Sequence, residues 1–155
     1  MLAQLEAAGG IYIAMFIIAL ISGVFPLVNS EVAVGVVALK LDSLPEVLVI
    51  AVIVALGQSI IHSTLFFTAR GLAKATADRR EKLQAKIEKA RALAERWGNK
   101  WLLLISAAAV LGFPPMILVA LAAGALGVRY RMFVTLDVTG RIVRFIAIAL
   151  AAFYF

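Results

Sequence analysis

The 155-residue sequence contains no cysteine, and its charged residues, Asp, Glu, Lys and Arg, make up only 15% of the chain. The absence of cysteine excludes disulfide bonds, thiol chemistry and metal sites built on thiolates. No glycine-rich phosphate loop, no Gly-x-Ser-x-Gly nucleophile elbow and no cluster of metal-ligating residues is visible. An enzymatic function therefore has no nucleophile, metal or cofactor site to rest on.

Hydrophobic residues are correspondingly abundant. They account for 64% of the chain, and the mean hydropathy is +1.04. This surplus exceeds what a soluble domain of this size needs for its core, and a lipid bilayer is the natural solvent for it. The composition predicts an all-α integral membrane protein whose main partners are membrane lipids.

The charge is concentrated in one segment. Ten of the fifteen Lys and Arg residues lie within residues 70–100, together with four of the nine acidic residues. The net charge of +6 could indicate nucleic acid, but no basic-aromatic nucleic-acid motif is present, so nucleic acid is not an expected partner. Because Lys and Arg accumulate in cytoplasmic loops, we expect residues 70–100 to be cytoplasmic.

Four apolar stretches cover residues 11–39, 44–69, 101–128 and 132–155. A hydrocarbon core of about 30 Å requires about 20 helical residues, so the second and fourth stretches fit as single spans. The first and third are longer and contain Gly and Pro near their middle, which predicts two helical hairpins that re-enter the membrane. The residues assigned to these breaks are Gly23, Pro26, Gly112, Pro114, Pro115 and Gly124.

An internal repeat supports this division. At a constant offset of 89 positions, Gly23, Pro26 and Gly35 recur as Gly112, Pro115 and Gly124. The same offset aligns the order of the elements, a hairpin followed by a span. We therefore predict one membrane domain over residues 1–155, with a first repeat at about 11–70, a connector at about 71–100 and a second repeat at about 101–155.

Charge distinguishes two topologies. If each long stretch crossed the membrane once, a cytoplasmic basic segment would place Arg129 and Arg131 outside. With two hairpins, both arginines return to the cytoplasmic side, in agreement with the positive-inside rule. The hairpin topology also inverts the two repeats and brings the hairpin tips together near the midplane. Broken backbone at that depth must be buried in protein or face water, so the tips are expected to mark a cavity.

The connector is expected to be one helix. Asp78 with Glu81 forms a capping box, and Gly98 provides a stop. A narrow apolar stripe follows helical spacing amid Lys and Arg; it consists of Leu83, Ile87, Ala90, Ala94 and Trp97. Two interpretations remain open: an amphipathic helix lying on the inner leaflet, or a solvated helix that only joins the repeats.

Six polar residues within the apolar stretches are the candidates for function: Glu31, Gln58, His62, Asp137, Arg141 and Arg144. Each ionised group near the bilayer centre costs on the order of 3 kcal/mol, so these groups should be paired, hydrated or bound to a ligand. Asp137, Arg141 and Arg144 share one face of the last span because their spacing is four and three residues. No metal site is predicted among them.

Each candidate has a functional and a structural interpretation. Arg141 and Arg144 suit the binding of a lipid phosphate, because guanidinium groups donate paired hydrogen bonds to oxyanions. Glu31 is either a proton-coupling or gating carboxylate or the partner of a structural salt bridge to one of these arginines. Asp137 is either a second proton-coupling group or simply neutralised by Arg141.

His62 and Gln58 lie on the second apolar stretch among Ser and Thr residues. A histidine in such surroundings is more often held by hydrogen bonds for structural reasons, and the alternative is a proton relay that includes Gln58.

The chain resembles the DedA superfamily, also called the VTT-domain or SNARE-associated Golgi proteins, over residues 23–149. Its motifs are Pro26 followed by Ser30-Glu31, the segment from Ala55-Leu-Gly-Gln58 to Arg70-Gly71, Trp97-Gly98, Phe113-Pro-Pro115, Ala122-Ala-Gly124, Met132-Phe133 and Gly140-Arg141-x-x-Arg144. Many members carry an arginine beside the proline of the second hairpin, and Gly112-Phe-Pro-Pro115 has none. The chain is most similar to the short bacterial or archaeal branch of the family.

The resemblance implies re-entrant hairpins, a place in a prokaryotic cell membrane and movement of lipid between leaflets. We therefore expect a flippase- or scramblase-like transporter of an anionic lipid, such as polyprenyl phosphate or a phospholipid, without a cofactor. Arg141 and Arg144 would attract the phosphate, while Glu31 and Asp137 would couple its passage to protonation. The alternatives are a membrane scaffold that transports nothing and a small-ion or drug exporter. A homo-oligomer is compatible with each of them.

Overall fold

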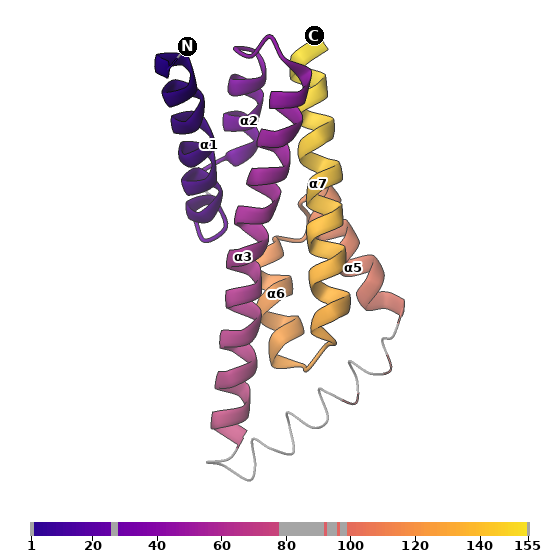
Figure 1. The fold of residues 1–155 in the computed structure, drawn as a ribbon. Helices are drawn as coiled ribbons and strands as arrows, with labels where there is room; N and C mark the ends of the chain where they lie inside the picture. Colours follow the sequence, from indigo (N-terminus) through magenta and orange to yellow (C-terminus); the bar gives the residue numbers. More distant parts are fainter. Residues whose placement is uncertain (1, 26–27, 78–91, 93–95, 97–98, 155) are drawn as a thin grey trace. The chain divides into compact units, whose positions relative to one another are not determined.

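The computed structural model describes residues 2–25, 28–77, 92, 96 and 99–154. Regular secondary structure in these residues is entirely helical, which confirms the all-α prediction, and no strand occurs among them. Figure 1 shows the helices α1 (Leu2–Ser22), α2 (Ser30–Ala38), α3 (Leu44–Ala77), α5 (Asn99–Leu111), α6 (Met116–Ala125) and α7 (Tyr130–Tyr154).

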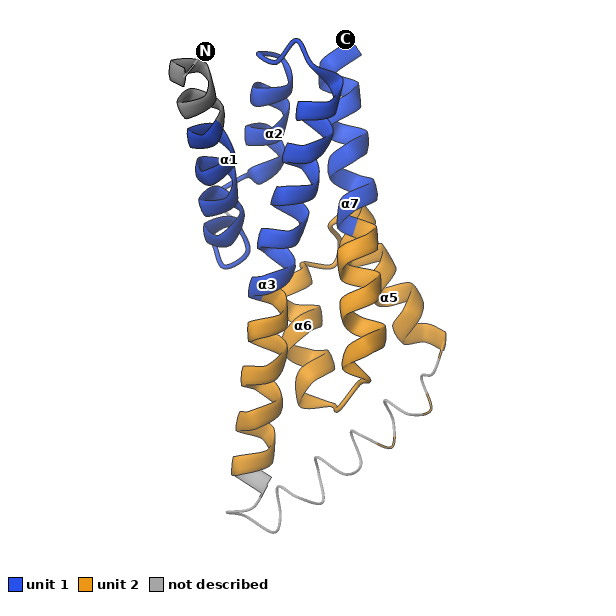
Figure 2. Ribbon diagram, in the orientation of Figure 1, with its two compact units in different colours: residues 1–61, 141–155 blue, residues 62–140 orange. Residues whose placement is uncertain are grey.

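The chain packs as two compact units. Unit 1 comprises residues 1–61 and 141–155, and unit 2 comprises residues 62–140 (Figure 2). The units cut across the two predicted repeats, because α3 and α7 each contribute residues to both units. Each unit has its own apolar core, and each is described by itself below.

Unit 1 contains the first predicted break. α1 ends at Ser22 and α2 begins at Ser30, and the two helices contact each other. The core of the unit is formed by α1, α2, the first part of α3 and the last part of α7, with Val54 and Ala19 fully buried. Gly23 directly follows α1, and a Cβ at this position would lie 2.9 Å from Cβ of Ile61, so the missing side chain allows close approach to α3.

Unit 2 contains the second predicted break. α5 ends at Leu111 and α6 begins at Met116, and these two helices also contact each other. Gly112 has a φ of 76°, a conformation that favours glycine and stops α5. Pro115 is the N-cap residue of α6, where a missing backbone N–H does little harm. The core of the unit includes Trp101 and Phe133.

Gly124 does not belong to a break, contrary to its assignment from the sequence. It lies inside α6 and is buried. A Cβ on Gly124 would stand 2.1 Å from the backbone carbonyl oxygen of Phe66 in α3. The glycine is therefore required by the close contact of two helices. α6 ends at Ala125, and Gly127, whose φ is 77°, follows its C-cap residue Leu126.

The helix lengths refine the predicted stretches. α1 begins at Leu2 rather than near residue 11, and it has 21 residues. The alanines at its start favour helix, which explains the extension. α3 has 34 residues, and among the described residues it is the one helix long and apolar enough to cross a membrane by length and composition. Pro26 and most of the connector, including its predicted apolar stripe, lie outside the described residues.

Candidate functional site

The site in unit 1 begins at the first turn of α2. Asn29 is the N-cap of this helix, and its side-chain oxygen accepts hydrogen bonds from the backbone N–H groups of Glu31 (2.9 Å) and Val32 (3.3 Å). An N-cap of this kind satisfies amide groups that have no partner within the helix. It fixes the start of α2 and therefore the direction in which Glu31 leaves the backbone. The positive end of the helix dipole also favours a carboxylate in this turn.

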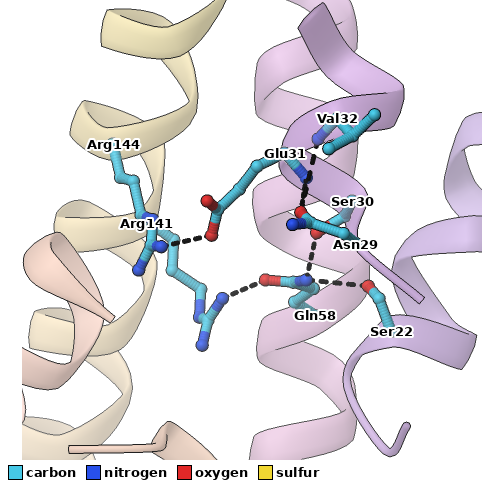
Figure 3. A network of polar contacts seen from close by, with 8 residues as sticks. All are labelled: Ser22, Asn29, Ser30, Glu31, Val32, Gln58, Arg141 and Arg144. Atoms are coloured by element: carbon cyan, nitrogen blue, oxygen red, sulfur yellow. Dashed lines mark hydrogen bonds and ion pairs between the residues drawn. The ribbon is translucent and has the colours of Figure 1, made fainter. Parts of the chain in front are cut away.

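Gln58 lies at the centre of a buried hydrogen-bond network (Figure 3). Its amide nitrogen donates to Oγ of Ser22 at 2.8 Å and to Oγ of Ser30 at 2.6 Å. Its carbonyl oxygen accepts a hydrogen bond from Nη1 of Arg141. Ser22 is the last residue of α1 and Ser30 the first of α2. The Gln58 side chain of α3 is therefore hydrogen-bonded to the end of α1, to the start of α2 and to Arg141 of α7.

Glu31 and Arg144 form an ion pair within the same unit, with Nη2 of Arg144 donating to Oε1 of Glu31. The Glu31 side chain is 39% exposed and that of Arg144 is 17% exposed. Arg141, one turn earlier on α7, is buried. Figure 3 shows both guanidinium groups directed from α7 toward the side that carries Glu31 and Gln58. The site thus combines two cations with one carboxylate that water can reach.

This arrangement can exchange oxyanions. A guanidinium group binds carboxylate and phosphate through the same planar N–H groups. Because the Glu31 carboxylate is partly exposed, a competing oxyanion can approach Arg144 without first unpacking the core. The neutral Gln58 amide accepts a hydrogen bond from Arg141.

Asp137 and His62 form a separate pair within unit 2. Nδ1 of His62 lies 3.3 Å from Oδ2 of Asp137. Both side chains are buried, with exposed fractions of 2% and 0%. The hydrogen bond orients the imidazole ring, as a carboxylate partner commonly does. The relay expected from the sequence joined His62 with Gln58, but the contacts place His62 with Asp137 and Gln58 with Arg141.

Ser22 and Ser30 are members of the Gln58 network that sequence reasoning did not assign to the site. They are 36 and 28 positions from Gln58 in the chain, so no local spacing connects them with it. The available signal was their position at the two ends of the predicted break. Within the described residues, no group of three His, Asp or Glu side chains could hold a metal ion.

Comparison with known proteins found no matching family model, no matching curated protein and no matching solved structure. The resemblance to the DedA superfamily therefore stays a prediction from the sequence.

Proposed function

We propose that this chain is an integral membrane protein that moves an anionic lipid between leaflets. Its surface supports a membrane location, because every described helix exposes at least one large apolar side chain, such as Ile13 (64%), Leu103 (73%) or Leu118 (61%). Soluble monomers seldom expose extensive apolar surface. α3 adds a helix of sufficient length and hydropathy to cross a bilayer.

The observation that carries the transport proposal is the contact network of Arg141 and Arg144. Two cations on an apolar helix are engaged by a neutral amide and by one partly exposed carboxylate, beside the break between α1 and α2. Charged groups within membrane helices are costly and usually serve function. In the proposed mechanism the lipid phosphate replaces Glu31 at Arg144, and protonation of the released carboxylate lowers the cost of leaving it unpaired.

The wider arrangement is part of the same proposal. We place the protein in a prokaryotic cell membrane, with the hairpins α1–α2 and α5–α6 re-entrant and the two repeats inverted. Residues 70–100 then lie on the cytoplasmic side, in agreement with their charge. The order of a helical hairpin followed by a long helix, which occurs twice, supports this arrangement. The resemblance to the DedA superfamily supports it as well.

Reconstitution tests the proposal. The protein is placed in liposomes that contain labelled polyprenyl phosphate or labelled phospholipid, and the appearance of label in the opposite leaflet is followed with an impermeant quencher. We expect protein-dependent movement of at least one phosphate lipid, with slower movement in the Arg141→Gln and Arg144→Gln variants. Equal rates in protein-free and protein-containing liposomes for all the lipids would contradict the proposal.

A membrane scaffold is the second candidate, and the Glu31–Arg144 ion pair favours it because such a pair can simply join α2 to α7. The Glu31→Gln variant distinguishes the two functions. Glutamine still accepts a hydrogen bond from Arg144 but cannot take up and release a proton. A transporter is expected to fold and lose activity, whereas a scaffold is expected to lose thermal stability.

A further inference from the structure

One end of unit 2 carries a set of basic side chains, which we call the basic end: Arg70, Lys74, Lys100, Arg129 and Arg131. They come from the C-terminal part of α3, the start of α5, and the connection between α6 and α7 with the first turn of α7. In Figure 2 the end of α3 and the α6–α7 connection lie at the lower side of the orange unit, and the start of α5 lies at its right-hand edge. Lys74, Lys100, Arg129 and Arg131 are exposed, and Arg70 is half-buried.

The basic end has no carboxylate partner in the described part of the chain. The ion pairs His62–Asp137 and Glu31–Arg144 include none of its five members. The described acidic residue of unit 2 is Asp137, which is fully buried and bonded to His62. Within the residues that the structure describes, these five cations therefore have no carboxylate counter-charge.

Aromatic side chains accompany these cations. The ring of Tyr130 lies 4.5 Å from that of Phe67 and 5.5 Å from that of Phe66, measured between centroids. The Arg70 guanidinium stands 5.6 Å from the centre of the Phe66 ring. The Tyr130 hydroxyl donates a hydrogen bond to Oγ of Ser63 at 3.1 Å. Rings with a polar end beside Lys and Arg are typical of the boundary between hydrocarbon and headgroups.

Exposed apolar side chains lie next to the same cations in the chain. Phe67 is 50% exposed and Leu72 is 64% exposed on α3, beside Arg70 and Lys74. Leu103, three positions after Lys100, is 73% exposed. An acidic soluble partner would neutralise the cations but leave this apolar surface in water. A ligand with both an anionic group and hydrocarbon chains satisfies both.

We propose that the basic end of unit 2 is a binding surface for the headgroups of anionic phospholipids. The phosphate groups lie against the Arg and Lys side chains, and the acyl chains cover the exposed leucine and phenylalanine side chains. The residues of this surface belong to unit 2, whereas Arg141 and Arg144 belong to unit 1. This surface rests on the proposed membrane location but not on lipid transport.

Fluorescence quenching by brominated lipid tests the surface on the full chain. The chain has two tryptophans, Trp97 and Trp101, and Trp101 is buried in the core of unit 2. Both are changed to phenylalanine, and Leu103→Trp places the reporter at a position that is 73% exposed, three residues after Lys100. The protein is reconstituted in vesicles of phosphatidylcholine and phosphatidylglycerol in which one or the other lipid is brominated. Stronger quenching by the brominated phosphatidylglycerol gives its binding constant relative to phosphatidylcholine. We expect this constant to exceed unity and to fall by up to about five-fold for each arginine removed in Arg129→Gln and Arg131→Gln.

Lys40→Gln is the matched control, because Lys40 is an exposed cation of unit 1 and its removal changes the net charge equally. This variant should keep the preference for phosphatidylglycerol, and Arg131→Lys should keep it too. Equal binding constants for the two lipids in the parent protein would overturn the proposal, as would equal losses in Lys40→Gln and Arg129→Gln. If a variant that combines Arg129→Gln and Arg131→Gln fails to insert into vesicles, the single variant Arg131→Gln is compared with Lys40→Gln instead. Equal losses of the preference in these two variants would overturn the proposal.

The outcome is independent of the transport assay. A protein that prefers phosphatidylglycerol but moves no lipid would support this surface and contradict the proposed function. A protein that moves lipid but shows no preference for phosphatidylglycerol at the Leu103→Trp reporter would support the proposed function and contradict this surface.

Discussion

At the scale of single residues, Gln58 uses both ends of its amide: two N–H bonds to serine hydroxyls and a carbonyl bond to Arg141. Replacement by leucine removes all three bonds and leaves buried polar groups without these partners. We expect Gln58→Leu to lower the free energy of unfolding by about 2–4 kcal/mol, because each unsatisfied buried group costs about 1–3 kcal/mol. Thermal unfolding of the purified variant in detergent measures this loss.

The neighbouring Ser59 provides the control. Its Oγ is buried and has no hydrogen-bond partner in the described structure. Ser59→Ala removes a hydroxyl group that contributes no bond and should change the melting temperature little. If Gln58→Leu has the same melting temperature as the parent protein and as Ser59→Ala, the network does not stabilise unit 1.

The sequence identified Gln58 and the two arginines because polar side chains are rare in apolar stretches. It also offered Arg144 as one of two alternative partners for Glu31, and the structure selects that alternative. The sequence could not predict that Gln58 contacts Arg141, since 83 positions separate them and only tertiary packing joins them. The pairing of His62 with Asp137, 75 positions apart, was hidden for the same reason.

At the scale of elements, α6 and α3 approach each other so closely at Gly124 that an added methyl group would overlap the Phe66 carbonyl oxygen. Backbone cannot move aside as a side chain can, so the two helices must separate. We expect Gly124→Ala to destabilise the protein by about 1–3 kcal/mol or more, the range seen for overpacked cores. The change in melting temperature in detergent reports the effect.

Gly71 is the matched control on α3. It is exposed, and a Cβ there would meet nothing within 4 Å. Gly71→Ala should be neutral or stabilise the helix by about 0.5–1 kcal/mol, since alanine has the higher helix propensity. If Gly124→Ala and Gly71→Ala change the melting temperature equally, the close contact of α6 with α3 does not constrain the fold.

The helix boundaries show what local sequence can and cannot determine. The ends of α1 and α5 were predictable because proline and glycine act on their immediate backbone. Gly124 was misassigned because a glycine that permits close packing looks the same in sequence as one that ends a helix. The early start of α1 was missed because its first residues carry no apolar period.

At the scale of the whole molecule, the proposed topology places residues 70–100 and the connection between α6 and α7 on the cytoplasmic side. The chain has no native cysteine, so single cysteines can report accessibility without interference. We expect Ala85→Cys and Arg131→Cys to be protected from an impermeant thiol reagent in intact cells. Lys40→Cys, in the opposite connection of the proposed topology, should be labelled. Labelling of only one of Ala85→Cys and Arg131→Cys would contradict the paired hairpins.

The function of Arg141 and Arg144 can be separated from their contribution to stability. A lipid phosphate carries up to two negative charges and several acceptor oxygens, so it can satisfy both guanidinium groups, as one carboxylate cannot. Lysine keeps the charge but loses the planar set of N–H donors. If the arginines bind phosphate, changing both to lysine should weaken lipid binding more than it lowers the melting temperature, and changing both to glutamine should abolish binding.

Two measurements on each variant decide between these roles: the melting temperature in detergent, and its rise when polyprenyl phosphate is added. A ligand that binds the folded state raises the melting temperature, so the rise reports binding. A structural role predicts the opposite order, because Glu31 would lose its Arg144 partner and unit 1 would unfold first. Lysine variants that melt far below the parent but gain the same increment from the lipid would assign the arginines to the structure of the protein rather than to its ligand.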